Sequence, residues 1–350
     1  MAEVTPTTIA YKQVGELTLY IDVYPPPTGT TSYRPVPAVV FFHGGGMTVG
    51  DRSSWLPIWL CRRTTATGLA FISADYRLMP PGTGHDVLED VVDLFAYLAK
   101  TPLLGTTPID GTRLAVAGSS AGGMCAFLAA VHAKPKPLAV LSIYGLGGDV
   151  FSPHLLAPKN EPFFLGRELL DPAEYSAFLY PATTTLPPIA QSKPTFFGRE
   201  SAKAGLPSNP RHVLAQLWLQ FGTYLDYWTG LHEPSISETL RELLPTKDED
   251  EDTEISTKDA RFFNALPVSE RAIFPQLWVT PEWPPVFLIH GSEDTAVLTD
   301  SSRVIHSRLL DAGVKSTLHI LDGFDHSFDL KRSAEETFEK LGQTLGFVYL

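Results

Sequence analysis

Residues 113–133 read RLAVAGSSAGGMCAFLAAVHA, and this stretch points most directly to the fold. Residues 113–118 form a short apolar run typical of a strand buried on both faces, and residues 121–133 have the small and apolar side chains of a buried helix. Between them, the segment 118–122 fits the pattern G-x-S-x-G around Ser120. Glycines two residues before and after the serine let a strand and a helix approach closely around a strained turn. The pattern predicts that the Ser120 hydroxyl projects from a sheet edge at the partly positive end of a helix.

The same turn has a second interpretation, a helix N-terminus that binds a phosphate group. Loops of that kind continue with Gly-Lys-Ser or Gly-Lys-Thr. Here the helix continues with Gly122-Gly123-Met124, so the reactive-serine interpretation is favoured.

Similar apolar runs recur along the chain and alternate with helical spacing. Two alternating stretches predict an antiparallel hairpin over 9–14 and 17–24. Further strands are predicted over 38–42, 69–74, 138–145, 286–291 and 316–321, and helices over 53–67, 86–100, 300–312 and 333–345. Strands that alternate with helices favour a mostly parallel central sheet that is flanked by helices on both faces.

Residues 149–285 interrupt this alternation. They hold more than half of the 30 prolines, and their clearest helical spacing runs over 211–227. Their acidic run, 248–252, lacks the glycine and the oxygen spacing of a calcium loop and is interpreted as a solvated loop. We expect one core domain from 1–148 and 286–350, with 149–285 inserted as a helical cap over the carboxyl ends of the strands. Trp218 and Phe221 in the cap are expected to contact the ligand.

The composition restricts the partners. The 350 residues include 27 Lys and Arg against 39 Asp and Glu, a net charge of −12 that disfavours nucleic acid. Cys61 and Cys125 match neither a disulfide framework nor a metal pattern. The first ten residues do not resemble a signal peptide, and no run reaches the ~18 apolar residues of a membrane span. We expect a cytoplasmic protein without metal, membrane span or nucleic-acid partner, and a homodimer stays open.

Three other segments carry groups that a reactive serine needs. His43-Gly44-Gly45-Gly46 follows the strand 38–42, and successive glycines there either form a plain turn or direct backbone N–H groups at an anion. A nucleophilic serine also needs a base and an acid that orients the base. Asp294 follows the strand 286–291, with Glu293 as the weaker alternative, and His326 follows the strand 316–321. Three histidines inside predicted strands or helices are interpreted as structural: His290, His306 and His319.

Together, the motifs HGGG (43–46), DYRL (75–78), GSSAGG (118–123), HGSED (290–294) and DHSF (325–328) resemble one esterase family. This is the hormone-sensitive-lipase-like, HGGG-type branch of the α/β-hydrolase esterases, and the resemblance covers most of 36–148 and 284–345. It implies an α/β-hydrolase fold in which Ser120 is the nucleophile, Asp294 the acid and His326 the general base. The oxyanion donors that it implies are three backbone amides, those of Gly44, Gly45 and Ala121. No metal or organic cofactor is implied.

Two positions depart from the family pattern. Ser119 precedes the nucleophile where the family usually has Asp, and Met79-Pro80-Pro81 follows the DYRL motif where the family usually has Ala-Pro-Glu. Both positions support the nucleophile and oxyanion loops in the family. The departures leave open the fine positioning of the site and its substrate preference.

The resemblance implies a serine esterase that cleaves a carboxylic ester or lactone through an acyl-enzyme. The acidic charge of the chain and the aromatic side chains of the cap favour a small apolar substrate. One alternative is an acyltransferase or lactone-forming enzyme of small-molecule biosynthesis, in which an alcohol or amine replaces water. Another is a ligand receptor of the same fold without catalysis. A receptor is expected to lose a member of the triad, whereas this chain keeps Ser120, Asp294 and His326.

Overall fold

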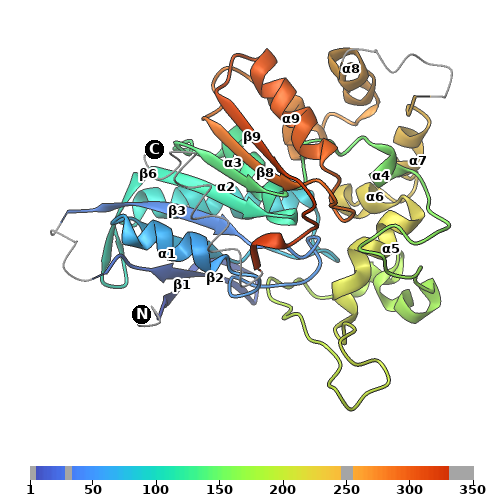
Figure 1. Cartoon of the computed structure of the whole chain (residues 1–350), viewed down its shortest axis with the longest axis horizontal. Helices are drawn as coiled ribbons and strands as arrows, with labels where there is room; N and C mark the ends of the chain where they lie inside the picture. Colours follow the sequence, from blue (N-terminus) through green and yellow to red (C-terminus); the bar gives the residue numbers. More distant parts are fainter. Residues whose placement is uncertain (1–4, 28–33, 246–254, 331–350) are drawn as a thin grey trace.

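A nine-stranded sheet forms the centre of the computed structural model, which describes residues 5–27, 34–245 and 255–330 (Figure 1). Its strands are β1 Thr7–Val14, β2 Leu17–Tyr24, β3 Val36–Phe42, β4 Ala70–Ala74, β5 Leu103–Leu104, β6 Thr107–Ser119, β7 Val140–Ile143, β8 Val286–Gly291 and β9 Ser316–Leu321. Their order is β1-β2-β4-β3-β6-β7-β8-β9, with β5 paired to β6. The pairs β1–β2 and β2–β4 are antiparallel, and the pairs along the path from β4 to β9 are parallel. The mostly parallel sheet expected from the sequence is confirmed.

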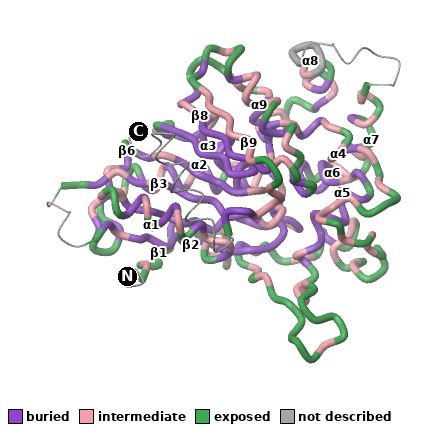
Figure 2. The backbone as a smooth tube through the Cα atoms, viewed as in Figure 1, coloured by how far each residue is buried: buried purple, intermediate pink, exposed green. Residues whose placement is uncertain are grey.

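Helices cover both faces of this sheet. They are α1 Ile58–Ala66, α2 Gly84–Lys100, α3 Ala121–His132 and α9 Asp300–Asp311. Because strand side chains alternate between faces, Val40 and Phe42 of β3 join the larger core with residues of α2, α3 and α9, whereas Phe41 joins a smaller core with Leu60 and Cys61 of α1. Both faces of the central strands are therefore buried, as Figure 2 shows, which explains why their sequences read as unbroken apolar runs.

Short helices and loops join β7 to β8. The α-helices are α4 Pro153–Leu156, α5 Leu214–Phe221, α6 Tyr224–Thr229, α7 Ile236–Arg241 and α8 Ile255–Ala265. Short 3-10 helices occur at Pro172–Phe178, Ala182–Thr185, Pro210–Val213, Arg271–Ile273 and Pro275–Trp278, and one follows β9 at Phe328–Leu330. Figure 1 places α4 to α7 together beyond one end of the sheet, and the loop around residue 200 projects from them and is exposed in Figure 2. We keep 149–285 as the proposed cap.

The helix expected over 211–227 is wrong, because the chain breaks at Gly222. This residue has φ +64°, a left-handed conformation that ends α5, and α6 starts at Tyr224. A Cβ at position 222 would also lie 2.3 Å from the carbonyl oxygen of Leu156. Because α5 and α6 both bury apolar side chains in the same core, the apolar spacing continues across Gly222. The sequence pattern therefore gives no sign of the break.

The helix expected over 53–67 begins only at Ile58. Pro57 stands at its N-cap, and proline disfavours helical geometry at the residue before it. Residues 51–54 instead form a turn in which the amide of Ser54 donates to the carbonyl oxygen of Asp51. The helix expected over 333–345 and the acidic run 248–252 lie outside the described residues.

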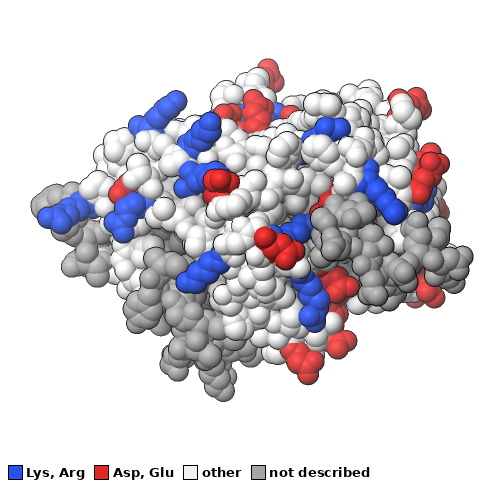
Figure 3. Space-filling model, turned by 90° about the horizontal axis from the view of Figure 1, so that it is seen from above, with Lys and Arg blue, Asp and Glu red and all other residues white. Residues whose placement is uncertain are grey.

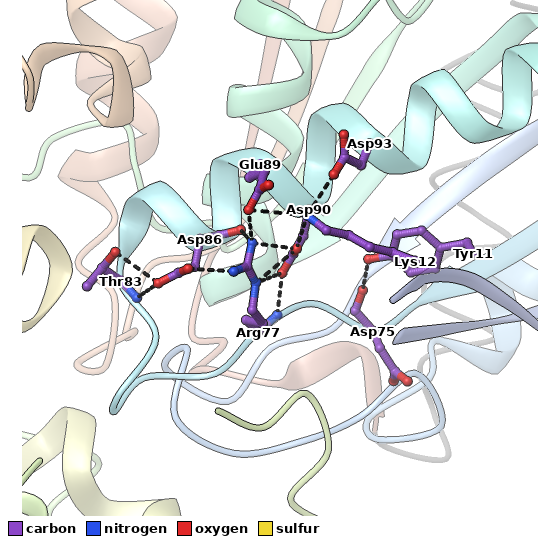
Figure 4. A network of polar contacts seen from close by, with 9 residues as sticks. All are labelled: Tyr11, Lys12, Asp75, Arg77, Thr83, Asp86, Glu89, Asp90 and Asp93. Atoms are coloured by element: carbon purple, nitrogen blue, oxygen red, sulfur yellow. Dashed lines mark hydrogen bonds and ion pairs between the residues drawn. The ribbon is translucent and has the colours of Figure 1, made fainter. Parts of the chain in front are cut away.

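A buried ionic network fastens the segment after β4 to α2 (Figure 4). The guanidinium of Arg77 donates to Asp86 at 2.6 Å and to Asp90 at 2.9 Å, and the backbone amide of Arg77 donates to Asp90 at 2.8 Å. Lys12 of β1 reaches the same Asp90 at 2.8 Å. Asp90 is fully buried, so losing a cation here would leave an uncompensated buried charge. The network explains why a charged motif, DYRL, follows a buried strand.

The parallel register brings the ends of five strands to one edge. Phe42 of β3 lies opposite Gly118 of β6, and Ile143 of β7 lies between Ser119 and Ile289 in the register. At the end of β8, Gly291 lies opposite Leu321 of β9. The segments that follow these strands contain the HGGG motif, Ser120, Asp294 and His326, so separate parts of the sequence meet at this edge.

Charges of both signs are scattered over the face drawn in Figure 3, whose described residues form no continuous basic stripe of the kind that binds nucleic acid. Within the described ranges, no helix combines the length and the apolar character that crossing a membrane requires.

Candidate active site

Ser120 occupies a strained turn between β6 and α3. Its φ of 53° and ψ of −123° lie in a region that residues with side chains rarely adopt. The flanking glycines make the turn possible. A Cβ at Gly118 would lie 2.0 Å from the carbonyl oxygen of Gly122, and one at Gly122 would lie 2.0 Å from that of Phe42. The spacing of the G-x-S-x-G pattern thus reflects close contact between backbones.

Ser120, His326 and Asp294 form one hydrogen-bonded chain. Nε2 of His326 lies 3.0 Å from Oγ of Ser120, and Nδ1 of His326 lies 2.6 Å from Oδ2 of Asp294. An ionised carboxylate only accepts hydrogen bonds, so the Nδ1 proton donates to Asp294 and Nε2 is left to accept from the serine hydroxyl. The structure thus brings together the three side chains that the sequence predicted from segments far apart in the chain.

The carboxylate of Asp294 is buried and held by four donors. Its Oδ1 accepts from the amides of Ala296 at 2.9 Å and Val297 at 3.0 Å, and its Oδ2 faces Nε2 of His290 at 3.1 Å as well as His326. Burial raises the pKa of Asp294, but the hydrogen bonds from His290 and His326 outweigh it and hold the pKa well below its usual range. Asp294 is therefore ionised at neutral pH.

The residues that were alternatives for the acid and the base lie outside this hydrogen-bonded chain, with one exception. The side chain of Glu293 is exposed to solvent. Nδ1 of His306 pairs with the Ser316 hydroxyl at 2.8 Å, and the ring of His319 stacks on Phe287 with centroids 5.2 Å apart. The exception is His290, whose contact with Asp294 makes it part of the site. The position of His290, four residues before Asp294, is the sequence signal that could have identified this contact.

The HGGG segment is held by side chains and by its own turn. The hydroxyl of Tyr76, in the DYRL motif, donates to the carbonyl oxygen of His43 at 2.9 Å, and the two rings stack 4.5 Å apart. Burial lowers the pKa of His43 to about 4, so its ring is neutral, and Nδ1 lies 2.7 Å from the carbonyl oxygen of Gly44. The carbonyl oxygen of Gly45 accepts from the amide of Thr48 at 3.0 Å. These bonds fix the peptide planes of the loop.

Gly44 and Gly45 line the same cavity as Ser120 and Ala121. A Cβ at Gly44 would lie 3.1 Å from Cβ of Ser120, so the loop passes directly beside the serine. Ala121 is the first residue of α3, where backbone N–H groups have no partner within the helix. The three residues expected to supply oxyanion donors thus surround Ser120.

Sequence reasoning missed Tyr144 and Asp329. The ring of Tyr144 lies 4.5 Å from that of His326, and its hydroxyl donates to the buried carboxylate of Asp329 and is a hydrogen-bond partner of Ser119. The esterase family that the sequence resembles usually has Asp at position 119. Here Ser119 at that position contacts the phenol of Tyr144, and the carboxylate of Asp329 lies on the other side of that phenol. Tyr144 directly follows β7 at the active edge, and this position in the sequence is the signal that could have identified it.

The cavity in front of Ser120 has a volume of about 270 Å³. Helix α5 contributes Ala215 and Leu219 to its wall, one turn apart on one helix face. Trp218 is fully buried and stacks on Tyr227 with ring centroids 3.9 Å apart, whereas Phe221 is 37% exposed. Neither residue lines the cavity. The expectation that Trp218 and Phe221 contact the ligand is therefore wrong, because the face of α5 they occupy does not meet the cavity.

No group of three or more histidine, cysteine, aspartate or glutamate side chains within the described ranges is arranged to hold a metal ion. Cys61 and Cys125 are buried free thiols.

The comparison with protein families agrees with this geometry. A sequence profile of the α/β-hydrolase fold family matches residues 39–192, which include the HGGG segment and Ser120. The chain has the α/β-hydrolase fold. The fold that the resemblance to the HGGG-type esterases implied is confirmed.

Solved structures similar to this α/β-hydrolase extend over nearly its whole length. An α/β-hydrolase superfamily protein from Enterococcus faecalis aligns with a TM-score of 0.61 and 18% identity, covering 98% of this chain and 99% of that one. A thermophilic esterase from Thermogutta terrifontis aligns with a TM-score of 0.54 and 16% identity, covering 97% of this chain and 93% of that one. At these identities the likeness concerns the fold.

Curated relatives of this α/β-hydrolase are of two kinds. The protein named probable carboxylesterase M8, from a Phoma species, is 33% identical over 38% of this chain and 45% of its own length. The non-reducing polyketide synthase pkbA of Emericella nidulans is 26% identical over 95% of this chain but 13% of its own length. The chain thus spans less than half the length of these relatives. The match to the polyketide synthase includes the proposed cap, whereas the match to the carboxylesterase is confined to 144 residues.

Proposed function

We propose that this α/β-hydrolase is a serine esterase that cleaves a carboxylic ester. The observation that carries the proposal is the hydrogen-bonded chain Ser120–His326–Asp294, which opens into a cavity beside the HGGG segment. Nucleophile, base and orienting acid in this arrangement are what acyl transfer requires.

In the proposed reaction, Oγ of Ser120 attacks the acyl carbon while Nε2 of His326 takes its proton. The amides of Gly44, Gly45 and Ala121 donate to the oxyanion that develops, and each such donor contributes several kcal/mol to the transition state. The protonated His326, stabilised by Asp294, then gives the proton to the departing alcohol oxygen. The C–O bond of the ester breaks and an acyl-enzyme remains on Ser120.

Water completes the proposed cycle. His326 removes a proton from the water molecule as its oxygen attacks the acyl carbon, and the same three amides stabilise the second oxyanion. When the bond to Ser120 breaks, His326 returns the proton to Oγ and the carboxylic acid leaves. The enzyme regains its starting protonation state, and no cofactor takes part in any step.

The substrate is proposed to be a small molecule with an apolar body. The cavity walls include Leu155, Phe164, Leu219 and Val297, which suit an acyl chain or aromatic ring. A cavity of about 270 Å³ suits a small molecule rather than a polymer. The cytoplasmic location stays a prediction, and the homodimer stays an open possibility.

A second candidate function is acyl transfer or lactone formation in small-molecule biosynthesis. It is favoured by the match of 95% of this chain to a polyketide synthase, whereas the match to the carboxylesterase covers 38% of it. The same acyl-enzyme would then pass its acyl group to an alcohol or amine instead of water. Counting free acid against acylated acceptor in one incubation distinguishes the two outcomes.

The experiment that tests both candidates is a panel of p-nitrophenyl esters of rising acyl length, run beside a fluorophosphonate probe. We expect release of p-nitrophenol and labelling of one site, both lost in Ser120→Ala. Ser119→Ala is the matched control, because the neighbouring serine ends β6 and is bonded to Tyr144, and it should still be labelled. A Ser120→Ala protein that is labelled like the wild type would overturn the assignment, and a protein that takes no label and cleaves no ester would favour the non-catalytic receptor.

A further inference from the structure

The cavity wall contains an arginine that the proposed reaction does not use. Arg167 lies in the proposed cap, just after a turn in which its amide donates to the carbonyl oxygen of Phe164 at 3.0 Å. Arg167 lines the cavity together with Ser120 and His326, and its guanidinium carbon lies 5.9 Å from the ring centre of Phe164, another lining residue. The side chain is only partly exposed, so part of the guanidinium's hydration is lost.

Arg167 has no carboxylate partner within the described parts of the chain, unlike the buried or partly buried Arg52, Arg77 and Arg308. Arg52 pairs with Asp22 and Asp75, Arg77 with Asp86 and Asp90, and Arg308 with Asp259. Arg211, which also lacks an acid, instead donates to the backbone carbonyl oxygens of Met79 and Pro80. For Arg167 the structure records a ring contact but no side-chain hydrogen bond to any described residue. A half-buried cation without a counter-ion is costly, so an anion supplied from outside the chain would stabilise it.

The rest of the cavity wall leaves this charge uncompensated. Among its described lining residues there is no Asp, Glu or Lys, although the whole chain has 39 acidic and 27 basic residues. Burial, with a further contribution from Arg167, lowers the pKa of His212 to about 4, and burial lowers that of His154 to about 4. Both rings are therefore neutral at pH 7. The cavity of an acidic protein thus carries one fixed positive charge and no negative one.

We propose that Arg167 binds an anionic group of the substrate, so that the preferred ester carries a carboxylate in addition to the bond that is cleaved. A guanidinium presents two parallel N–H groups that match the two oxygens of a carboxylate. The apolar walls hold the body of the molecule, Arg167 holds its acidic end, and Ser120 attacks the ester. This inference rests on the proposed esterase function and adds a substrate class to it.

The test compares matched anionic and neutral esters. On the acyl side, the p-nitrophenyl monoester of glutaric acid is compared with p-nitrophenyl valerate. On the alcohol side, 4-acetoxybenzoate is compared with 4-acetoxybenzamide. In Arg167→Gln we expect kcat/KM for the anionic member of at least one pair to fall about 10- to 100-fold, mainly through KM, because a charged hydrogen bond is lost. The neutral members should stay within about threefold, and Arg167→Lys should recover part of the loss.

Arg199→Gln is the matched control, because it removes the same charge from an exposed position in the proposed cap that does not line the cavity. It should change every ester by less than about twofold. A wild-type measurement adds an independent arm that needs no variant: valerate should inhibit cleavage of p-nitrophenyl acetate more strongly than valeramide does. Equal inhibition, or equal losses for the anionic and neutral esters in folded Arg167→Gln, would overturn the proposal.

The two levels of inference fail in different ways. If p-nitrophenyl acetate is not cleaved and Ser120 takes no fluorophosphonate, the esterase function is wrong. If neutral esters are cleaved in a Ser120-dependent manner but Arg167→Gln leaves the anionic preference unchanged, only the role of Arg167 is wrong.

Discussion

Nε2 of His290 lies 3.1 Å from Oδ2 of Asp294, the same oxygen that accepts from His326. The ring of His290 is fully buried, and it is held by the Ser302 hydroxyl on Nδ1 at 2.8 Å and by the carbonyl oxygen of Val297 on Nε2 at 2.8 Å. The acid of the proposed triad thus has a histidine on each side, one facing Ser120 and one inside the fold. We interpret His290 as a positioning residue that orients the carboxylate.

The first prediction concerns that orientation. His290→Asn removes the donor to Oδ2 and should lower kcat about tenfold with KM nearly unchanged, because the acid loses a fixed partner while the cavity keeps its walls. Steady-state kinetics on p-nitrophenyl acetate measure the split, with a thermal melt to check folding. The matched control is His306→Asn, because that ring pairs with Ser316 away from the site. A folded His290→Asn enzyme with unchanged kcat, or with the loss confined to KM, would show that His290 only fills space.

The second prediction separates the two neighbouring carboxylates. Asp294→Asn should preserve the fold and lower kcat by up to ~10⁴, by analogy with loss of the orienting acid in serine proteases. Glu293→Gln should stay close to the wild type, because the side chain of Glu293 is exposed. Both variants are measured with the same ester. An inactive Glu293→Gln beside an active Asp294→Asn would contradict the hydrogen-bonded chain described here.

The third prediction concerns the wall formed by α5. Leu219→Trp should fill part of the cavity and move the optimum of the ester series to shorter acyl chains. Activity on p-nitrophenyl acetate should stay within about tenfold, because acetate is too short to use that wall. Phe221→Ala, on the same helix but 37% exposed and outside the cavity wall, is the control and should leave the optimum in place. An unchanged optimum in Leu219→Trp, or a shifted one in Phe221→Ala, would place the acyl chain elsewhere.

The fourth prediction concerns stability against pH. Burial lowers the pKa of His154 to about 4 from the ordinary 6.5, so between these values the unfolded chain binds a proton that the folded chain does not. The contribution of His154 to the free energy of unfolding should therefore have its full value above about pH 6.5 and decline as the pH falls toward 4. In that window His154→Gln should reduce the slope by about one proton, or about 1.4 kcal/mol per pH unit. Urea unfolding at several pH values measures the slope, and equal slopes for both proteins would contradict a neutral His154 in the folded protein.

Much of the sheet and the turn at Ser120 were predictable because they depend on local properties of the chain. Unbroken apolar runs indicated strands that are buried on both faces. The glycines at 118 and 122 indicated a close contact between backbones that leaves no room for a Cβ. Ser120, Asp294 and His326 were identified by where they follow predicted strands, since parallel strands end at one edge of the sheet. The break at Gly222 was not predictable, because the apolar spacing runs on through it.

By itself, then, the sequence determined most strands of the central sheet and the positions of Ser120, Asp294 and His326 at the active edge, because strand burial and close backbone contacts restrict residue type at each position. Only the tertiary structure decided how side chains from distant segments meet. Leu219 rather than Trp218 lines the cavity, because the packing of α5 selects the face that meets it. His290 joins Asp294 because the chain after β8 turns back on itself. Arg167 is without a carboxylate because charge pairing depends on distances in space, which hydrophobic periodicity and motif spacing do not report.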